Sequence, residues 1–261
     1  MSYVAVFSGG ECAADTDAVV QKLGRPACII AADSGFERAR EFAVRNALKI
    51  DLLIGDMDSI PKKSFDEYRE NREYREDCAA GGLCGIEKWD CEKDLTDTEL
   101  ALLRAHELSA AHKNCRVVLF GGSGGERAEH FLALIKILHK EYAPHLWFFG
   151  MQCVCVLSAH TQRRITLTHC TEHDALSFFC ASAGVAHNAA HNSEGVIHAE
   201  GLFWSIDSID WERGDFSLSN KISREYEAQQ KPVQITVERG VFFLMSSLHI
   251  FLHTNFCDDA A

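Results

Sequence analysis

Short apolar runs alternate with amphipathic stretches over the first 150 residues of this 261-residue chain. The apolar runs end in glycine, serine or aspartate, as strands followed by turns do. They occupy residues 4–7, 27–32, 51–54, 116–120 and 145–149, and the amphipathic stretches include residues 36–47, 97–111 and 129–142. Because strands and helices in alternation form βαβ units, the sequence predicts a mostly parallel α/β domain over residues 1–150.

The pattern changes after residue 151. Short apolar runs follow one another, separated by polar turns and without helical periodicity of useful length, at residues 152–157, 164–167, 175–180, 195–198, 216–219, 233–237 and 241–248. This spacing predicts a second domain over residues 151–261, built as an all-β sandwich or barrel. We expect the end of the chain, residues 249–261, to fray. Residues 64–77 are almost wholly polar and predict an exposed helix whose role stays open.

Charge and composition exclude several classes of partner. The formal net charge is -12 and the isoelectric point about 5.5, so neither nucleic acid nor an anionic membrane is an expected partner. No charged and then apolar leader opens the sequence, and a cytoplasmic location is expected. The eleven cysteines are odd in number and lack zinc-site spacing, so most are expected to be small buried hydrophobes. Cys153 and Cys155 alternate along a predicted strand and face one side, towards the core.

Four aspartates stand in two short blocks where an apolar run ends and a helix begins. Asp56 and Asp58 follow the predicted strand 51–54, and Asp94 and Asp97 precede the predicted helix. The carboxyl edge of an open α/β sheet is where ligands bind, and carboxylates gathered there repel one another unless a cation joins them. Oxygen ligands of this kind suit Mg²⁺ held together with substrate phosphates. Each block taken alone is equally typical of a turn or a helix cap.

A glycine-rich run at residues 121–125 follows another predicted strand. Such a run lets backbone N–H groups approach an anion closely, although neither a Walker A sequence nor G-x-G-x-x-G is present. Arg127 follows it, and a guanidinium group grips phosphate in a bidentate manner. Lys93, beside the second aspartate block, is another candidate cation. The alternatives are a flexible loop and a solvated surface lysine.

These segments together resemble one family, the thiamine pyrophosphokinases, over nearly the whole chain. The motifs in the first half are A-D-S-G at residues 32–35, G-D-M-D-S at 55–59 and D-L-T-D at 94–97. The family's G-G-R-x-D-H loop is approximated at residues 124–130, with one residue inserted before Arg127 and Glu129 in place of aspartate before His130. In the second half, G-L-F-W at residues 201–204 resembles G-L-K-W, and residues 214–220 resemble G-x₄-S-N.

The resemblance implies an α/β nucleotide domain, a C-terminal β-sandwich, and a homodimer that binds thiamine between its subunits. It implies transfer of a pyrophosphoryl group from ATP to the hydroxyl of thiamine, which gives AMP and thiamine diphosphate. The implied catalytic residues are Asp56, Asp58, Asp94, Asp97 and Arg127, with Mg²⁺ held by Asp56, Asp58 and Asp97. The implied ATP-positioning residues are Gly10, Asp33, Ser34, Gly35, Lys93, Thr96, Gly122 and Ser123. The implied thiamine pocket consists of Trp204, Ser219 and Asn220.

Two other functions stay open at this point. A pyrophosphokinase for another alcohol, such as a pterin, would keep the aspartates and reshape the second half. A nucleotide-binding regulator without turnover would fit the altered loop around Arg127. Trp204 has an alternative of its own, because a tryptophan in a sandwich commonly packs in the core.

Overall fold

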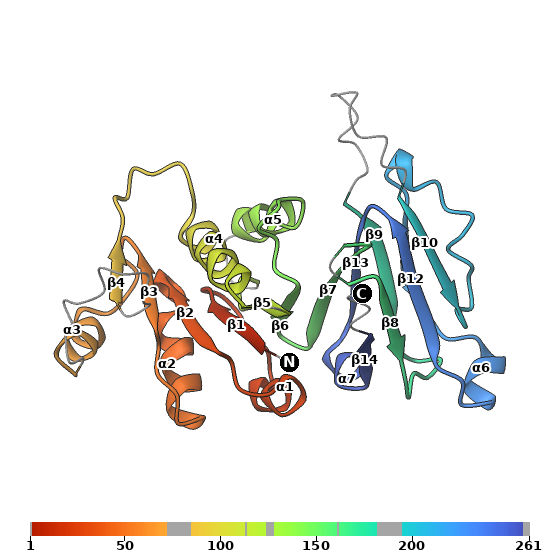
Figure 1. The fold of residues 1–261 in the computed structure, drawn as a ribbon, viewed down its shortest axis with the longest axis horizontal. Helices are drawn as coiled ribbons and strands as arrows, with labels where there is room; N and C mark the ends of the chain where they lie inside the picture. Colours follow the sequence, from red (N-terminus) through yellow and green to blue (C-terminus); the bar gives the residue numbers. More distant parts are fainter. Residues whose placement is uncertain are drawn as a thin grey trace. The chain divides into compact units, whose positions relative to one another are not determined.

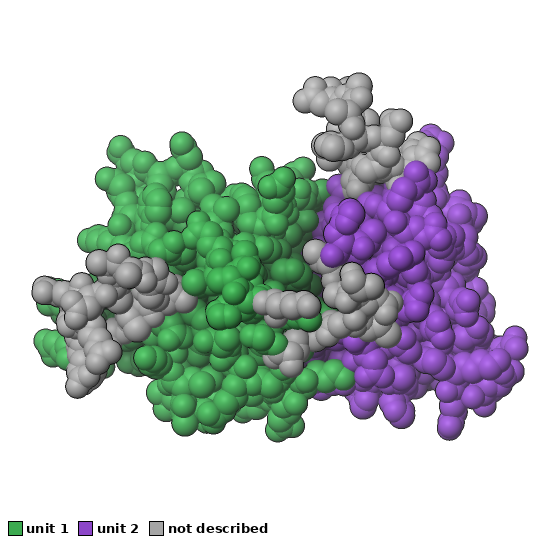
Figure 2. Space-filling view, viewed as in Figure 1, with its two compact units in different colours: residues 1–150 green, residues 151–261 purple. Residues whose placement is uncertain are grey.

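The computed structural model describes residues 2–71, 85–112, 114–123, 128–160, 162–181 and 195–257. The chain divides into two compact units, Met1–Gly150 and Met151–Ala261, coloured separately in Figure 2. This division falls where the sequence changes from alternating strands and helices to strands alone.

The first unit contains a parallel sheet. Within its described residues the strand order is β6-β5-β1-β2-β3-β4, and all five neighbouring pairs are parallel. The strands are β1 (Ser2–Phe7), β2 (Cys28–Ala32), β3 (Leu52–Gly55), β4 (Gly85–Lys88), β5 (Cys115–Phe120) and β6 (Leu146–Phe149). Every residue of β2, β3 and β6 is buried, as expected of parallel strands covered on both faces.

Helices cover the two faces of this sheet. They are α1 (Thr16–Leu23), α2 (Phe36–Arg45), α3 (Lys62–Asn71), α4 (Asp97–Ala110) and α5 (Ala128–Ile137), with a 3₁₀ turn η1 (Asp33–Gly35) between β2 and α2. Figure 1 shows α2 and α4 on opposite sides of the sheet. Helix α4 packs against β1, β2, β3 and β5 through a buried face that includes Leu100, Ala101, Leu102 and Ala105. Among the described residues, no helix is long and apolar enough to cross a lipid bilayer.

The order of the strands places the ligand-binding edge. Strand β2 lies on one side of β1, and β5, which comes later in the chain, lies on the other. The direction of the winding therefore reverses between β1 and β5. In open α/β sheets, ligands bind outside the carboxyl ends of the strands at such a reversal.

The apolar periodicity of the sequence does not predict two elements of the first unit, α1 and β4. Helix α1 has only eight residues, and Thr16, Val19 and Leu23 are its only buried positions, so its apolar period is too short to stand out. Strand β4 is a half-exposed edge strand without an apolar run. The predicted helix over residues 64–77 is confirmed in part, because α3 begins two residues earlier at Lys62 and runs to Asn71. Residues 72–77 lie outside the described residues.

The second unit consists of two antiparallel sheets. Their strand orders, within the described residues, are β11-β9-β13-β7 and β10-β12-β8-β14. The strands are β7 (Gln152–Ser158), β8 (Arg164–Leu167), β9 (Leu176–Cys180), β10 (Val196–Glu200), β11 (Phe216–Asn220), β12 (Val233–Arg239), β13 (Val241–Ser247) and β14 (Thr254–Cys257). The strand prediction for residues 152–247 is confirmed. Cys153 and Cys155 are buried, and their Sγ atoms lie 3.8 Å apart on one side of β7.

The expectation that residues 249–261 fray is wrong for the described part of this segment. A short helix, α7 (Leu248–Leu252), is followed by β14, which pairs with β8. Two side-chain hydrogen bonds stabilise the junction: the Thr168 hydroxyl donates to His253 O at 2.6 Å, and the Thr254 hydroxyl donates to Ile250 O at 2.9 Å. Pairing across 85 residues of sequence is invisible to local periodicity. A second short helix, α6 (Arg224–Ala228), and a 3₁₀ turn, η2 (Trp211–Arg213), complete the unit.

Candidate active site

Asp33 lies directly after β2 and begins the turn η1. Its side chain is buried, and its backbone φ of +32° lies in the left-handed region that few residues other than glycine adopt. The Oδ1 atom has no hydrogen-bond partner among the described residues. A buried carboxylate oxygen without a partner is costly, so strain and missing contacts together mark Asp33 as a functional residue.

Asp56 occupies the corresponding place after β3. The backbone N–H of Asp58 donates to Asp56 Oδ1 at 3.2 Å, and Met57 between them has a φ of +67°. This tight turn directs Asp56 and Asp58 differently. Asp56 is partly buried, whereas Asp58 is exposed and accepts a hydrogen bond from the Ser59 hydroxyl at 2.9 Å.

Asp97 is the first residue of α4. Thr96 caps this helix in a capping box: its hydroxyl accepts from Glu99 N at 3.2 Å, and the Glu99 carboxylate accepts from Thr96 N at 3.0 Å. The capping box provides hydrogen bonds to N–H groups at the start of the helix, so the Asp97 carboxylate is not needed as a cap. The two interpretations of this aspartate block are therefore compatible, since Thr96 caps the helix and Asp97 faces the site. Asp94 is exposed.

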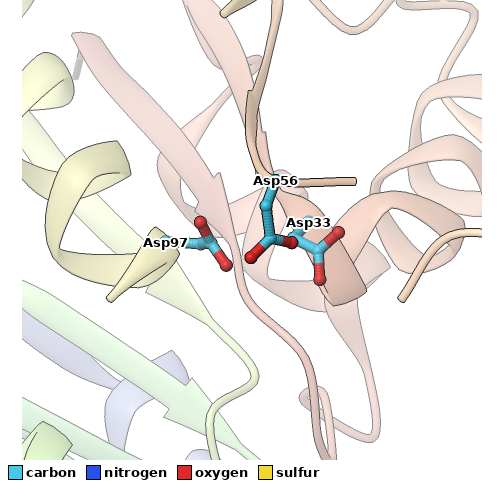
Figure 3. Close-up of side chains that lie close together, drawn as sticks. All are labelled: Asp33, Asp56 and Asp97. Carbon is cyan, nitrogen blue, oxygen red and sulfur yellow. The ribbon is translucent and has the colours of Figure 1, made fainter. Parts of the chain in front are cut away.

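The three aspartates Asp33, Asp56 and Asp97 converge (Figure 3). One carboxylate oxygen from each lies within 4.8 Å of the others. Gly55 permits this approach, because it has a φ of +139° and a Cβ atom there would lie 2.9 Å from both Asp33 Cβ and Asp97 Cγ. The cluster thus draws on the ends of β2 and β3 and the start of α4. Asp33 replaces the predicted Asp58 in it.

Lys93 provides the positive charge of the cluster. Its Nζ lies 3.2 Å from Asp56 Oδ2 and 3.1 Å from Asp97 Oδ1, and its side chain is only 12% exposed. The contact with Asp56 is a hydrogen bond, whereas that with Asp97 is an ion pair without hydrogen-bond alignment. Burial lowers the pKa of Lys93, but the two carboxylates outweigh it and hold the pKa above its ordinary value. Lys93 is therefore charged at neutral pH.

The pKa values of the three carboxylates shift in different directions. Burial raises the pKa of Asp33, and the charges of Asp97, Asp56 and Asp58 add to it against an opposing hydrogen bond from Ser59. Burial likewise raises the pKa of Asp97, and the ammonium of Lys93 only partly offsets this. For Asp56 the effect of burial is outweighed by the Asp58 N–H and by Lys93, so its pKa is lowered. Burial thus penalises the charged forms of Asp33 and Asp97, and repulsion by neighbouring carboxylates adds to this cost.

This arrangement fits a divalent cation. Three carboxylates face one ammonium group, so the cluster has excess negative charge. Partly buried oxygen ligands within bonding reach of a common point, two of them without a hydrogen-bond partner among the described residues, are the donor set that Mg²⁺ prefers. The residues present therefore fit the metal that the sequence predicts, with Asp33 among the ligands.

The ends of β1 and β5 meet beside this cluster, at the reversal of the sheet. Glu11 N donates to Ser123 O at 2.5 Å, and a Cβ atom at Gly10 would lie 2.6 Å from that same oxygen. Ser34 and Gly35 of η1 approach Gly9 and Phe7 just as closely. Six of the predicted ATP-positioning residues, Gly10, Asp33, Ser34, Gly35, Gly122 and Ser123, thus lie at the carboxyl ends of β1, β2 and β5.

One expectation about this loop needs correction. The N–H of Gly121 donates to Phe148 O at 2.9 Å, and the N–H of Gly122 donates to Gly9 O at 2.5 Å. These two groups hold the strand ends together, so they do not point towards an anion. Gly124, Gly125 and Arg127 lie outside the described residues, and Glu129 and His130 are exposed at the start of α5.

The predicted thiamine residues lie in the second unit. Trp204 is 52% exposed, so it is not a core tryptophan. Asn220 is completely buried and is hydrogen-bonded to the backbone of Trp204. Ser219 is exposed and has a φ of +52°. Phe203, which the sequence interpretation did not single out, packs edge to face on Trp204 with ring centroids 4.8 Å apart.

Comparisons with known proteins agree with this architecture. Residues 20–148 match the family model described as "Thiamin pyrophosphokinase, catalytic domain". The fold is similar to that of a thiamin pyrophosphokinase family protein from Enterococcus faecalis, at 14% identity and a TM-score of 0.62, with 94% of this chain and 98% of that chain covered. It is also similar to thiamine pyrophosphokinase from Bacillus subtilis (17% identity, TM-score 0.59, 95% and 99% covered) and to thiamin pyrophosphokinase from Candida albicans (11%, 0.61, 94% and 90%). No curated protein matches the sequence significantly.

A parallel α/β unit with a carboxylate cluster at the carboxyl ends of its strands is the arrangement of an enzyme that binds its ligands at a sheet edge. Taken with the family match, the arrangement identifies this part of the chain. Residues 20–148 are a thiamin pyrophosphokinase catalytic domain.

Proposed function

We propose that this protein transfers the pyrophosphoryl group of ATP to the hydroxyl of thiamine and forms AMP and thiamine diphosphate. For these products, the thiamine oxygen must attack the β-phosphorus while the bond from that phosphorus to the α,β-bridging oxygen breaks. The hydroxyl proton is released, and the bridging oxygen leaves on AMP. The observation that carries the proposal is the cluster of Asp33, Asp56, Asp97 and Lys93 in a chain that contains this catalytic domain.

The cluster is proposed to hold Mg²⁺ through Asp33, Asp56 and Asp97. Bound there, the ion would neutralise charge on the triphosphate and on the leaving AMP. Asp58 lies outside the cluster but adds to its negative field, since its charge raises the pKa of both Asp33 and Asp97. Lys93 balances part of that field and is proposed to contact a phosphate oxygen of the nucleotide. The ends of β1 and β5, together with Arg127, are proposed to position the nucleotide.

The second unit is proposed to bind thiamine. The exposed indole of Trp204 offers a face for a flat cationic heterocycle, and Phe203 stands at its edge. Ser219 presents an exposed hydroxyl next to this segment. We also propose that the two antiparallel sheets pack face to face as a sandwich, since β8 and β12 alternate buried and more exposed side chains.

The protein is proposed to act as a homodimer in the cytoplasm. The described part of the second unit exposes large apolar side chains that include Phe203, Trp204, Phe216 and Leu218, each about half accessible. Exposed apolar side chains of this size mark a surface for association. The dimer would cover them and complete the thiamine site. Elution of the intact protein as a fully active monomer at assay concentration would contradict this part of the proposal.

The two other functions are not favoured. The family match and the structural neighbours name thiamin pyrophosphokinases, and neither points to a pterin substrate. A regulator without turnover is not favoured either, because the family model that matches residues 20–148 is described as a catalytic domain.

The deciding experiment is a product assay with purified protein, ATP and Mg²⁺. We expect AMP to appear only when thiamine is added, in equal amount to thiamine diphosphate. Formation of ADP would show transfer of a single phosphoryl group and contradict the proposal. A hydroxymethyl pterin in place of thiamine tests the first alternative, and nucleotide binding without any AMP would favour the second.

A further inference from the structure

The side chain of Asn220 is surrounded by hydrogen-bond partners from its own chain. Its Oδ1 accepts from Trp204 N at 3.2 Å and from Lys221 N at 2.9 Å. Its Nδ2 donates to Trp204 O at 2.8 Å and to the Ser217 hydroxyl at 3.3 Å. Both backbone polar groups of Trp204 are therefore bound by a single side-chain amide.

These contacts use the whole capacity of the amide. A carboxamide has two N–H donors and two oxygen lone pairs, and all four are engaged here. The residue is also 0% exposed. A substrate could reach Asn220 only by displacing the bonds that hold the Trp204 backbone. Direct recognition of a ligand by this side chain is thus incompatible with the structure.

The backbone around Asn220 brings its side chain against the Trp204 segment. The register of β11 with β9 shifts between Ser217 and Asn220, and Ser219 within this irregularity has a φ of +52°. The shift turns Asn220 inwards while its neighbours on β11 remain more exposed. Phe203 N donates to Lys221 O at 2.7 Å, and Leu202 bridges to Ile222, so the aromatic segment runs alongside the end of β11. The amide fills the position between them.

We propose that Asn220 is a positioning residue that acts on the substrate only through Trp204. It fixes the backbone at Trp204, so that the indole is presented to solvent in one orientation although half of its surface is exposed. A preorganised aromatic face binds a flat ring without first losing conformational freedom. The link from Trp204 to thiamine rests on the proposed function, whereas the link from Asn220 to Trp204 does not.

Hydrogen exchange tests the first link without any ligand. In Asn220→Leu, which keeps the branching at Cγ but has no polar atoms, the amide of Trp204 should exchange at least about tenfold faster, since its acceptor is lost. Asn220→Ala also removes the acceptor and leaves more room, so it provides a second variant should the leucine variant fold poorly. Ser217→Ala is the matched control, because it removes one partner of Asn220 and leaves both bonds to Trp204. Unchanged exchange at Trp204 in the folded Asn220 variants would overturn the proposal.

A double-mutant cycle tests the second link. We expect Asn220→Leu to raise the thiamine KM about two- to fivefold with the ATP KM unchanged, and to have no further effect in a Trp204→Ala background. Additive effects would mean that Asn220 acts independently of Trp204 and would overturn the proposal. A loss shared by both substrates together with a lower melting temperature would reduce Asn220 to a structural residue and also overturn it. Failure of the wild-type protein to use thiamine would instead contradict the proposed function, and the exchange experiment would still decide the role of Asn220.

Discussion

The carboxylate cluster and the Trp204 segment use polar side chains in opposite ways. At the edge of the parallel sheet, Asp33 is buried with an oxygen that lacks a hydrogen-bond partner among the described residues, and Lys93 is the one described cation paired with the cluster of three carboxylates. In the second unit, Asn220 is buried with every donor and acceptor satisfied. The group offered to solvent there is an aromatic face.

The difference separates a residue that binds from a residue that supports. Leaving a buried charge unsatisfied lowers stability, so it persists where a ligand or metal supplies the missing contact. A saturated amide has nothing left to offer a ligand, but it fixes the chain around it. Motif position alone assigns both kinds of residue to a site, and only their hydrogen bonds tell them apart.

The largest expected effect is at the carboxylates. We expect Asp56→Asn and Asp97→Asn to lower kcat by about 10²-fold or more with the fold intact, because each removes a charged ligand from the shared metal. Steady-state rates over a range of Mg²⁺ concentrations measure this effect. Glu107→Gln, on the exposed far end of α4, is the matched control for a lost carboxylate. Near-normal rates at limiting Mg²⁺ in either folded variant would refute the metal assignment.

The sequence predicts the first unit and its site well for a physical reason. Strands buried on both faces leave continuous apolar runs, and the residues directly after them must lie at the carboxyl edge. The predicted start of a helix places Asp97, and this rule places Asp56. It applies equally to Asp33 after β2, but the sequence interpretation gave Asp33 to the nucleotide, because it read the pairs of aspartates as the metal block. The turn at Met57 that directs Asp58 outwards depends on a single φ angle that local pattern does not reveal.

The second unit is predicted less completely. Alternating runs locate its strands, but pairing between distant strands, such as β14 with β8, follows from tertiary contacts that no local period encodes. The motif containing Asn220 marks an important position, yet the sequence does not tell whether the amide faces a ligand or the chain. That distinction depends on which backbone groups lie opposite it in the folded protein.

Acid should affect the first unit through two partly buried imidazoles. His145 stacks on His106 with ring centroids 5.5 Å apart, and burial together with the charge of His106 and Arg116 lowers the pKa of His145 from 6.5 to about 4. The unfolded chain then binds the proton more readily, so stability is full above about pH 6.5 and is lost as the pH falls towards 4. The loss can reach about 3 kcal/mol for this one group.

Chemical denaturation between pH 7 and pH 4 measures this loss, and His145→Gln should flatten the curve. His112→Gln, an exposed histidine of the same unit, should leave the curve unchanged. An identical slope in wild type and His145→Gln would show that the imidazole does not control acid stability.

A smaller effect is expected at Trp204. Removing the indole should raise the thiamine KM severalfold, in line with about 1 kcal/mol for an aromatic or cation–π contact, and leave the ATP KM nearly unchanged. Trp204→Phe should retain part of the affinity. Because the side chain is half exposed, the melting temperature should change little. Equal effects on both substrates with a collapsed melting temperature would contradict the assignment of Trp204 to the substrate surface.

The smallest effect is expected at Ser219. One pair of variants can decide whether this residue binds the ligand or shapes the chain. Ser219 has a φ of +52°, and its N–H donates to the Ser177 hydroxyl at 3.1 Å, a bond that any side chain at position 219 would keep. Ser219→Gly relieves the left-handed conformation but adds freedom to the unfolded chain, so the melting temperature should rise by only about 1–3 °C. Ser219→Ala removes the hydroxyl and keeps the strain. If the hydroxyl binds thiamine, both variants raise the thiamine KM equally although only one is stabilised. If neither variant changes KM, Ser219 serves, like Asn220, to shape the chain, and the thiamine surface consists of the aromatic face alone.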